Sequence, residues 1–288
     1  MSDVAVIPGA HRIPPHGYFL VSALFHYLGP AFAVLLFAQI APLGVAWLRI
    51  ASAAIIFALW RRPWRYLIAC APKERLVVAA LGLVLAAMNS VFYEAIARLP
   101  LSTVGAIEFL GPIGLAALGL RTMRNGVALV AAAGGVYLLT DIRIAGEPLG
   151  LLFAFANCAL FVLYIALGHL IAADGGKTGI DRLAAAMLIA AIAALPIGIA
   201  DARPALTDPL LLGAAIGVGV SSSVIPYICD QLAMARLPRA SFALMLALLP
   251  ATATVIGVIV LRQVPSGIEV FAIGLVIIGV ALHRRESA

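Results

Sequence analysis

Long apolar runs alternate with short polar connections along nearly the whole of this sequence. Runs of about 17–25 residues have the length of a helix that crosses the ~30 Å hydrocarbon layer of a bilayer. Because hydrocarbon offers the backbone no hydrogen-bond partner, such runs are expected to form helices, which satisfy their own backbone groups. The pattern predicts ten membrane-spanning helices, at about residues 17–37, 42–60, 76–96, 100–119, 125–140, 148–171, 183–200, 208–233, 238–261 and 266–283.

The composition of the chain agrees with this class and argues against several others. Of its 288 residues, 64% are hydrophobic and 11% are charged, whereas soluble domains carry about 25% charged residues. We therefore predict an all-α polytopic membrane protein. Cys70, Cys158 and Cys229 are far apart, and the sequence contains no phosphate-binding loop, zinc-ligand spacing or paired catalytic carboxylates in an aqueous loop. It predicts no metal site, no cofactor and no enzyme activity.

The net charge of +6 comes from basic residues in short loops between the apolar spans. We therefore expect membrane lipid and a small-molecule substrate as partners, and no nucleic acid. Most of the basic residues fall in alternate connections, and Lys and Arg are enriched on the cytoplasmic side of membranes. This distribution predicts that both termini are cytoplasmic. The sequence does not fix the oligomeric state, and a monomer is compatible with it.

A sequence repeat divides the chain into two halves. Ala-x-Ala-Arg-Leu-Pro at residues 95–100 recurs at residues 233–238, and a Leu-x-Pro follows each copy at the same spacing. The two copies are five predicted spans apart, and an odd number of crossings inverts the second copy in the membrane. Inverted repeats are common in secondary transporters. We predict a cytoplasmic tail at residues 1–16, a first five-helix repeat at 17–140, an inverted second repeat at 148–283 and a cytoplasmic tail at 284–288.

Two prolines occupy equivalent positions of the repeat inside predicted spans. Pro112 lies in the fourth span and Pro250 in the ninth. A proline inside a helix removes one backbone hydrogen bond and clashes with the carbonyl four residues earlier, so the helix bends there more easily. We predict that both prolines are hinges, because two symmetric weak points suit a protein that alternates between inward-open and outward-open shapes.

Ionisable side chains inside predicted spans are candidate functional residues, because burying them in a membrane is costly. Glu108 lies in the middle of the fourth span, beside the carbonyl that Pro112 leaves unbonded. It could bind an ammonium group or a proton, or it could be a protonated acid bonded to a neighbouring helix. Arg49 is expected either to pair with Glu108 or Glu94 or to extend outward to the interface. Glu94 and Asp230 lie near span ends and are predicted gate or interface residues.

Polar and aromatic residues share single helical faces in four spans. The face of the third span, with Asn89 and Tyr93, corresponds under the repeat to the face that Ser223 and Tyr227 share in the eighth span, as two walls of one cavity would. The alternative is ordinary hydrogen bonding and packing between helices, which polar residues in membrane bundles often provide. The predicted substrate-binding residues are Glu108 together with His26, Tyr27, Asn89, Phe92, Tyr93, Asn157, Phe161, Tyr164, Ser223 and Tyr227.

Three segments resemble a known family. These are Ala-Ile-Glu-Phe-Leu-Gly-Pro at residues 106–112, Pro-Tyr at 226–227 and Ala-Arg-Leu-Pro-Arg-x-x-Phe at 235–242. With ten helices in two inverted halves, the chain resembles the drug/metabolite transporter superfamily, specifically its EamA-type exporters. It is similar to the bacterial threonine/homoserine exporters and aromatic amino-acid exporters. It differs at Leu249, where threonine-exporter relatives carry an acidic residue before the proline of the ninth helix.

The resemblance implies a secondary transporter of the bacterial inner membrane. Its expected substrates are amino acids of the threonine/homoserine, methionine or aromatic type, and related small metabolites. One alternative is a broad drug or metabolite exporter of the same superfamily. Another is a solute channel that works without alternating access. The inverted halves and the prolines inside helices favour a transporter that alternates.

Overall fold

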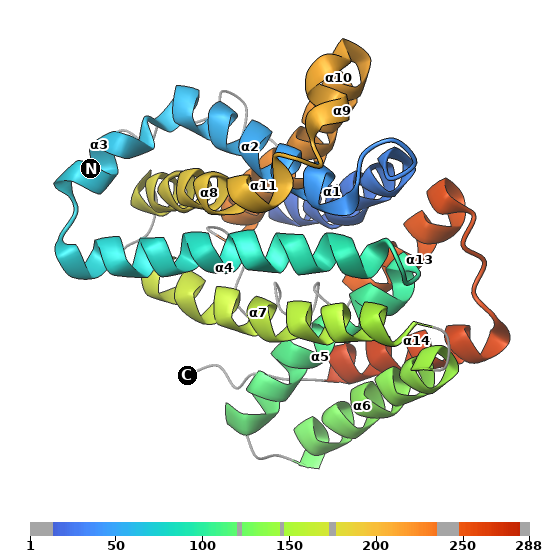
Figure 1. The fold of residues 1–288 in the computed structure, drawn as a ribbon. Coiled ribbons are helices and arrows are strands. Elements are labelled where there is room, and N and C mark those ends of the chain that lie inside the picture. Colours follow the sequence, from blue (N-terminus) through green and yellow to red (C-terminus); the bar gives the residue numbers. More distant parts are fainter. Residues whose placement is uncertain (1–13, 120–122, 145–146, 173–176, 235–247, 283–288) are drawn as a thin grey trace.

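The computed structural model describes residues 14–119, 123–144, 147–172, 177–234 and 248–282, and within these ranges the chain is helical apart from short connections (Figure 1). The elements are α1 (Pro15–Leu36), α2 (Pro42–Arg61), α3 (Pro63–Ala69), α4 (Pro72–Ile96), α5 (Leu101–Gly119), α6 (Met123–Ile144), α7 (Pro148–Ala172), α8 (Lys177–Gly198), α9 (Arg203–Thr207), α10 (Pro209–Gly219), the π-helical turn η2 (Val220–Val224), α11 (Ile225–Met234), α13 (Leu248–Leu261) and α14 (Gly267–Leu282).

Each predicted span coincides with helix in the part of the chain that the structure describes. Six stretches are long and apolar enough to cross a membrane, and they are Gly17–Leu36, Pro42–Arg61, Pro72–Ile96, Pro148–Leu167, Gly179–Gly198 and Pro209–Cys229. Four shorter apolar stretches, Leu101–Gly111, Met123–Leu139, Leu249–Leu261 and Gly267–Gly279, match the other spans. The all-helical polytopic membrane fold is thereby confirmed.

Several details go beyond the predicted pattern or lie outside what the structure describes. The eighth span is built from α10, η2 and α11 in succession, and the short helices α3 and α9 lie in connections between the predicted spans. The ninth span is described only from residue 248 onward, and most of the predicted tails at 1–16 and 284–288 lies outside the described residues. The repeat boundaries at 17–140 and 148–283 stay predictions.

Prolines and caps mark where many of the helices begin. A proline at the first helical position loses little, because its missing N–H would have no partner there; this holds for α1, α2, α3, α4 and α10. The Asp208 carboxylate accepts a hydrogen bond from the Leu210 N–H at 2.8 Å and so caps α10. Ser266 and Glu269 bond each other's backbone N–H groups, a capping box that starts α14.

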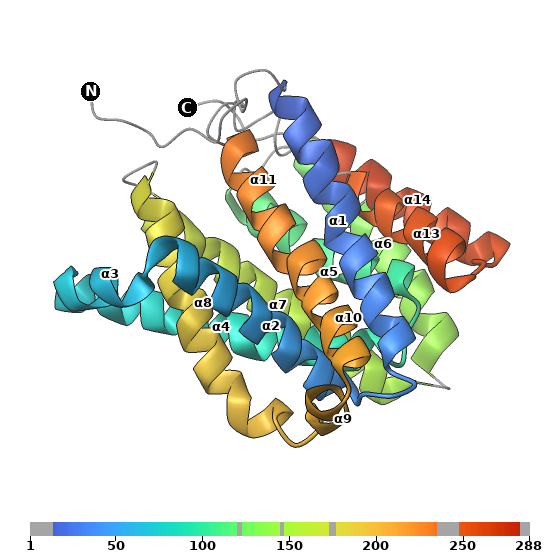
Figure 2. The ribbon, with the colours of Figure 1, turned by 90° about the horizontal axis from the view of Figure 1, so that it is seen from above.

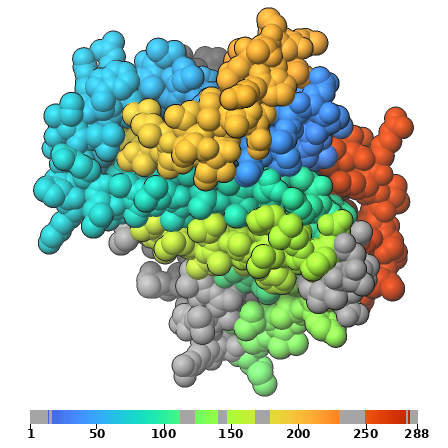
Figure 3. Space-filling model, in the orientation of Figure 1, coloured from blue at the N-terminus to red at the C-terminus, as the bar shows by residue number. Residues whose placement is uncertain are grey.

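Apolar side chains cover the outside of the bundle, as a membrane protein requires. Leu59, Val130 and Ile259 are each at least 70% exposed. Hydrocarbon is a suitable surrounding for such side chains, because it needs no hydrogen bonds from them. The buried polar residues lie inside the bundle instead. One face of the molecule, with α4 running across its middle, is drawn in Figure 3.

The helix packing brings α1, α2, α4, α5, α7 and η2 around one centre. Helix α4 packs between α7 and α8, and α2 packs against α8 (Figure 1). Helix α1 lies along η2 and α11 on one side and contacts α13 on the other, which Figure 2 shows from above. Helix α5 packs against α6, α7 and α13. Two buried apolar clusters form the core, one around α1, α5 and α7 and one between α2, α4 and α8.

Candidate functional site

Glu108 is a buried carboxylate at the meeting point of three helices. It lies on α5 and is only 4% exposed. The Tyr27 hydroxyl of α1 donates a long hydrogen bond of 3.5 Å to Glu108 Oε2, and Asn157 Nδ2 of α7 donates one of 3.1 Å to Oε1. Among the described residues no cation is bonded to this carboxylate. Each carboxylate oxygen can accept more than one hydrogen bond, so capacity for a further donor remains.

Two glycines of α5 allow the neighbouring helices to approach Glu108. A Cβ at Gly105 would lie 3.0 Å from the Tyr27 hydroxyl oxygen. A Cβ at Gly111 would lie 2.6 Å from Val162 Cγ2 and 2.9 Å from Cys158 Sγ on α7. Small residues of this kind let membrane helices pack closely. The local sequence of α5 therefore brings α1 and α7 to the carboxylate.

Arg49 is a second buried charge, of opposite sign, on α2. It is 6% exposed, and Nε donates to Ser223 Oγ while Nη2 donates to the carbonyl oxygen of Ser222, both at 2.9 Å. Its Cζ lies 5.5 Å from the centre of the Tyr93 ring, within the range of a cation–π contact. The predicted ion pair with Glu108 or Glu94 is not formed among the described residues, and burial excludes the alternative of an outward extension.

The carbonyl that Arg49 binds lies in a π-helical turn, four residues before a proline. Pro226 has no N–H, so the carbonyl four residues earlier, that of Ser222, lacks the donor that a regular α-helix would supply. The π turn Val220–Val224 lies at this point, and π turns occur often at functional sites. A Cβ at Gly29 of α1 would lie 2.1 Å from Ser222 Oγ, so glycine allows α1 to rest directly on the turn. Ser22 Oγ, also of α1, donates to the Pro226 carbonyl at 3.4 Å.

Aromatic rings surround both charges. The Tyr93 ring packs edge to face with Phe37 at a centroid distance of 6.1 Å. The His26 ring stands edge-on to Tyr27 at 5.2 Å. His26 is also close enough to Arg49 for a Coulombic interaction, as is Glu108.

The structure brings six of the predicted site residues into two groups. Tyr27, Glu108 and Asn157 form the first group, and Arg49, Tyr93 and Ser223 form the second. Phe92 packs beside Tyr93 with ring centres 5.9 Å apart. Phe161 packs with Phe109 at 6.1 Å and stacks on Tyr164 at 6.0 Å.

Other predicted residues lie apart from these two groups. The Asn89 amide donates to the Leu85 carbonyl of its own helix at 2.7 Å. Tyr227 is buried in the apolar cluster of α2, α4 and α8. Glu94, near the end of α4, forms an ion pair with Arg98 in the turn that follows the helix. The roles of these residues stay predictions.

The predicted hinges are only partly described. Helix α5 continues through position 112, and the side chains of Pro112 and Asp230 lie outside the described part of the chain. Pro250 is buried in α13, and its carbonyl accepts a hydrogen bond from Thr254 Oγ1 at 2.9 Å.

One cluster of charges was not predicted. At one end of the bundle Arg61 Nε donates to Asp181 Oδ1 at 2.7 Å, and Arg182 Nη2 donates to Glu74 Oε1 at 3.0 Å. Arg182 Nε also donates to the Tyr66 hydroxyl at 3.0 Å, and burial raises the pKa of that phenol above its ordinary value. These pairs connect α2, α3 and α4 to α8, and we call them the rim cluster. Pairing across more than a hundred residues leaves no local signal in the sequence.

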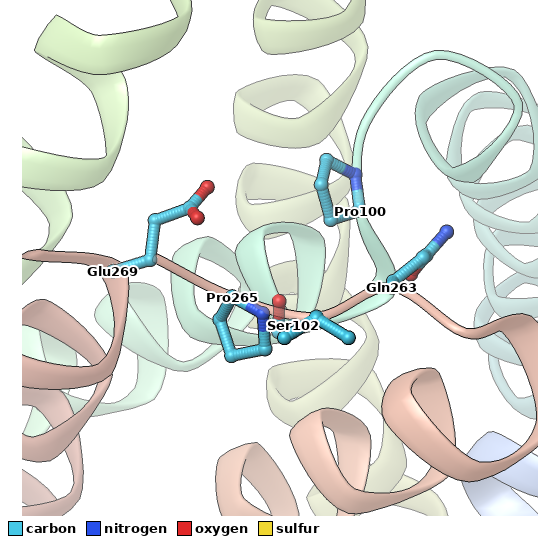
Figure 4. A pocket seen from close by; sticks show the side chains of 6 residues that line it. Pro100, Ser102, Gln263, Pro265 and Glu269 are labelled. Atoms are coloured by element: carbon cyan, nitrogen blue, oxygen red, sulfur yellow. The ribbon is translucent and has the colours of Figure 1, made fainter. Parts of the chain in front are cut away.

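A small pocket lies elsewhere, at the start of α5. It has a volume of about 220 Å³ and is lined by Pro100, Ser102, Gln263, Val264, Pro265 and Glu269 (Figure 4). The Gln263 Oε1 atom accepts a hydrogen bond from the Leu101 N–H at 3.0 Å, and Glu269 Oε2 caps α14. The Gln263 and Glu269 side chains in this pocket are therefore already hydrogen-bonded to backbone N–H groups at helix starts, and we assign them a structural role.

The sequence of this chain is similar to those of known transporters. The sequence pattern of the EamA-like transporter family matches residues 148–284, which covers the second predicted repeat. The threonine/homoserine exporter RhtA of Salmonella typhimurium strain LT2 is 31% identical over 255 residues, which cover 86% of this chain and 84% of that protein. The exporter of the same name from Escherichia coli strain K12 is 31% identical over 252 residues, with the same coverage.

A solved structure supports the fold independently. A protein of known crystal structure, 18% identical in sequence, has a TM-score of 0.61 and covers 93% of this chain and 96% of its own. Identity this low is evidence for the fold alone.

Proposed function

This chain belongs to the EamA-like transporter family of membrane exporters, and from that premise we propose its substrates. We propose that it moves threonine, homoserine and related small amino acids out of the cytoplasm. The relatives that cover most of the chain are exporters of threonine and homoserine by name. The chain is a transporter rather than an enzyme. The specific substrates and the mechanism proposed below go beyond that membership.

The observation that carries the proposal is the buried carboxylate of Glu108. It lies inside an apolar bundle, and neutral donors from Tyr27 and Asn157 are its described hydrogen-bond partners. A buried carboxylate is costly unless a partner compensates it. An amino acid carries an ammonium group with three N–H donors, the same inventory as a lysine head. Such a group fits the remaining acceptor capacity of Glu108, so we propose that Glu108 binds the ammonium group of the substrate.

We propose alternating access as the mechanism. Glu108 and Arg49 are both buried, so a solute must reach them through a change of shape. Prolines within α1, α8 and α11 and at the predicted hinge positions provide places where helices bend easily. The proposed orientation has both termini in the cytoplasm of the bacterial cell, with transport across the inner membrane.

Counterflow in reconstituted liposomes tests the proposal. Vesicles that contain the purified protein are loaded with unlabelled threonine, and their uptake of labelled threonine is measured. The control is the same protein-containing vesicles without internal threonine. A transporter that alternates is expected to show transient accumulation stimulated by the internal substrate. Homoserine, methionine and phenylalanine in place of threonine define the substrate class. Uptake that ignores the internal substrate would contradict alternating access and favour a channel, and absence of uptake for every amino acid would contradict amino-acid export.

A further inference from the structure

The guanidinium group of Arg49 has more hydrogen-bond donors than its surroundings use. Arginine carries five N–H donors in a planar fork. Among the described residues, the Ser223 hydroxyl accepts one of them and the Ser222 carbonyl accepts another. Both partners are neutral, and the ring of Tyr93 is the further contact of the cation. A buried cation without a counter-charge is costly, so an anion that arrives here would be bound strongly.

Two buried hydroxyl groups beside Arg49 also lack partners. The Tyr93 hydroxyl, on a side chain that is 0% exposed, and the Ser222 hydroxyl, on one that is 1% exposed, have no hydrogen bond of ordinary geometry to any described group. The Tyr93 hydroxyl nevertheless lies near both Ser222 and Arg49. Native proteins rarely leave buried polar groups unbonded, and each exception calls for an explanation. Arg49 of α2, Tyr93 of α4 and Ser222 of η2 therefore each bring an unused hydrogen-bond donor to the same part of the bundle.

The chemistry of these donors selects the group that fits. A carboxylate offers two oxygens in one plane, which match the fork of a guanidinium and leave lone pairs for hydroxyl donors. An ammonium group would be repelled by Arg49, and an apolar group would leave all the donors unbonded. Glu108 interacts with Arg49 only through the longer-range Coulombic field. The carboxylate that completes the group therefore has to come from outside the described residues.

We propose that Arg49, Tyr93 and Ser222 bind the free carboxylate of the exported amino acid, while Glu108 binds its ammonium group. This inference rests on the proposed function and specifies how the substrate is recognised. Helix α1 contacts both poles, through Tyr27 at Glu108 and through Gly29 at Ser222. Arg49 and Glu108 are also close enough to each other for a Coulombic interaction.

Such a site distinguishes amino acids from their derivatives that lack a carboxylate. Threoninamide keeps the ammonium group and the side chain of threonine but carries no negative charge. Homoserine lactone also keeps the ammonium group and carries no carboxylate, but its ring takes up the side-chain hydroxyl of homoserine. Buried polar groups that are left unpaired by the wrong ligand give strong discrimination. We expect the wild-type protein to prefer threonine over threoninamide by at least about tenfold in kcat/KM.

The test measures counterflow of labelled threonine and labelled threoninamide by the wild type and by variants of the carboxylate site. Arg49→Gln is expected to lose threonine transport and with it the preference for the free acid. Arg49→Lys keeps the charge but not the fork, and an intermediate preference is expected. Tyr93→Phe removes a single hydroxyl and is expected to raise KM for threonine while transport of the amide is unchanged. Arg61→Gln in the rim cluster is the matched control and should keep the full preference.

The possible outcomes separate this inference from the proposed function. If the wild type transports no amino acid, the proposed function fails. If the wild type transports threonine and threoninamide equally well, the carboxylate site is wrong although export stands. The site is also wrong if Arg49→Gln keeps the wild-type preference. Should Arg49→Gln not fold, Tyr93→Phe and Ser222→Ala decide, because an unchanged preference in both would overturn the site.

Discussion

Charged side chains are buried or half-buried in two regions of this molecule, and the two regions treat charge differently. In the rim cluster each described cation meets a carboxylate directly, as Arg61 meets Asp181 and Arg182 meets Glu74. At the centre, Arg49 and Glu108 are both buried and each is bonded to neutral groups instead. Paired charges hold helices together and retain little attraction for a charged ligand. Charges with neutral partners keep their attraction for a ligand, so the difference supports the proposal that the centre binds the substrate while the rim cluster is a structural contact.

The largest expected effect comes from removing the central negative charge. Glu108→Gln keeps the size of the side chain and can still bond Tyr27 and Asn157, but it cannot attract an ammonium group. Loss of one member of a buried charge pair costs at least about 2 kcal/mol, so we expect transport to fall by at least about thirtyfold. Thermal stability should stay equal or rise, since a costly buried charge has gone.

Glu94→Gln is the control for this substitution, because Glu94 pairs with Arg98 near the end of α4. Counterflow and thermal unfolding of both variants in the same detergent provide the measurement. Wild-type transport by Glu108→Gln would show that the two regions do not differ in function.

The second effect concerns the close packing that holds Ser222 beside Arg49. In Gly29→Ala the new Cβ would meet the Ser222 hydroxyl oxygen at 2.1 Å and its backbone nitrogen at 2.7 Å. Overpacking of this kind typically costs about 1–3 kcal/mol, which we expect to lower the melting temperature by several degrees. Gly217→Ala is the control, because nothing lies within 4 Å of a Cβ there. Equal melting temperatures for the two variants would mean that α1 and η2 are not in firm contact.

The third effect concerns the predicted hinges at Pro112 and Pro250. Replacing either proline by alanine restores a backbone donor and favours a straight helix, by up to about 3 kcal/mol. We expect turnover to fall several-fold while stability is unchanged or improved. If the halves are inverted repeats, the two variants should accumulate in opposite-facing states, which cysteine accessibility from each side of the membrane reports. Wild-type turnover in both variants would make the prolines ordinary packing residues.

The smallest effect is expected in the rim cluster. A double-mutant cycle of Arg61→Ala and Asp181→Ala should give a coupling energy of about 0.5–1 kcal/mol, as partly exposed ion pairs do. Raising the salt concentration should reduce it, because salt screens such pairs. Transport by the folded variants should remain close to wild type. Loss of transport without loss of stability would mean that the rim cluster takes part in the transport cycle. The rim cluster and the central charges would then not differ in function.

The sequence was sufficient to predict the helices and to single out the central charges. An apolar run of fixed length in a bilayer has few structural options, so span positions follow from hydropathy alone. Glu108 and Arg49 stand out because ionisable residues inside such runs are rare. The resemblance to EamA-type exporters, found in short motifs, is confirmed by relatives that cover most of the chain.

The partners of the central charges could not be predicted, because they depend on packing between helices. We expected Arg49 either to pair with a carboxylate or to extend outward, and the structure places beside it the carbonyl of Ser222, which lacks its α-helical donor because residue 226 is proline. A signal was present, since a proline four residues after a polar residue frees that carbonyl. The π turn also shifts the helical register between Ser223 and Tyr227. A regular period of 3.6 residues therefore predicted one shared face where the structure has two different environments.

The contact between Gly29 and Ser222 has a mechanical consequence. No side chain of α1 separates its backbone from the π turn at this point, so no flexible layer can absorb a displacement between them. The two segments have to travel together or slide past one another along the contact. The opposite side of α1 is held to α5 by the long 3.5 Å hydrogen bond between Tyr27 and Glu108. The bundle is therefore expected to part along that side, with α1 and η2 moving as one body.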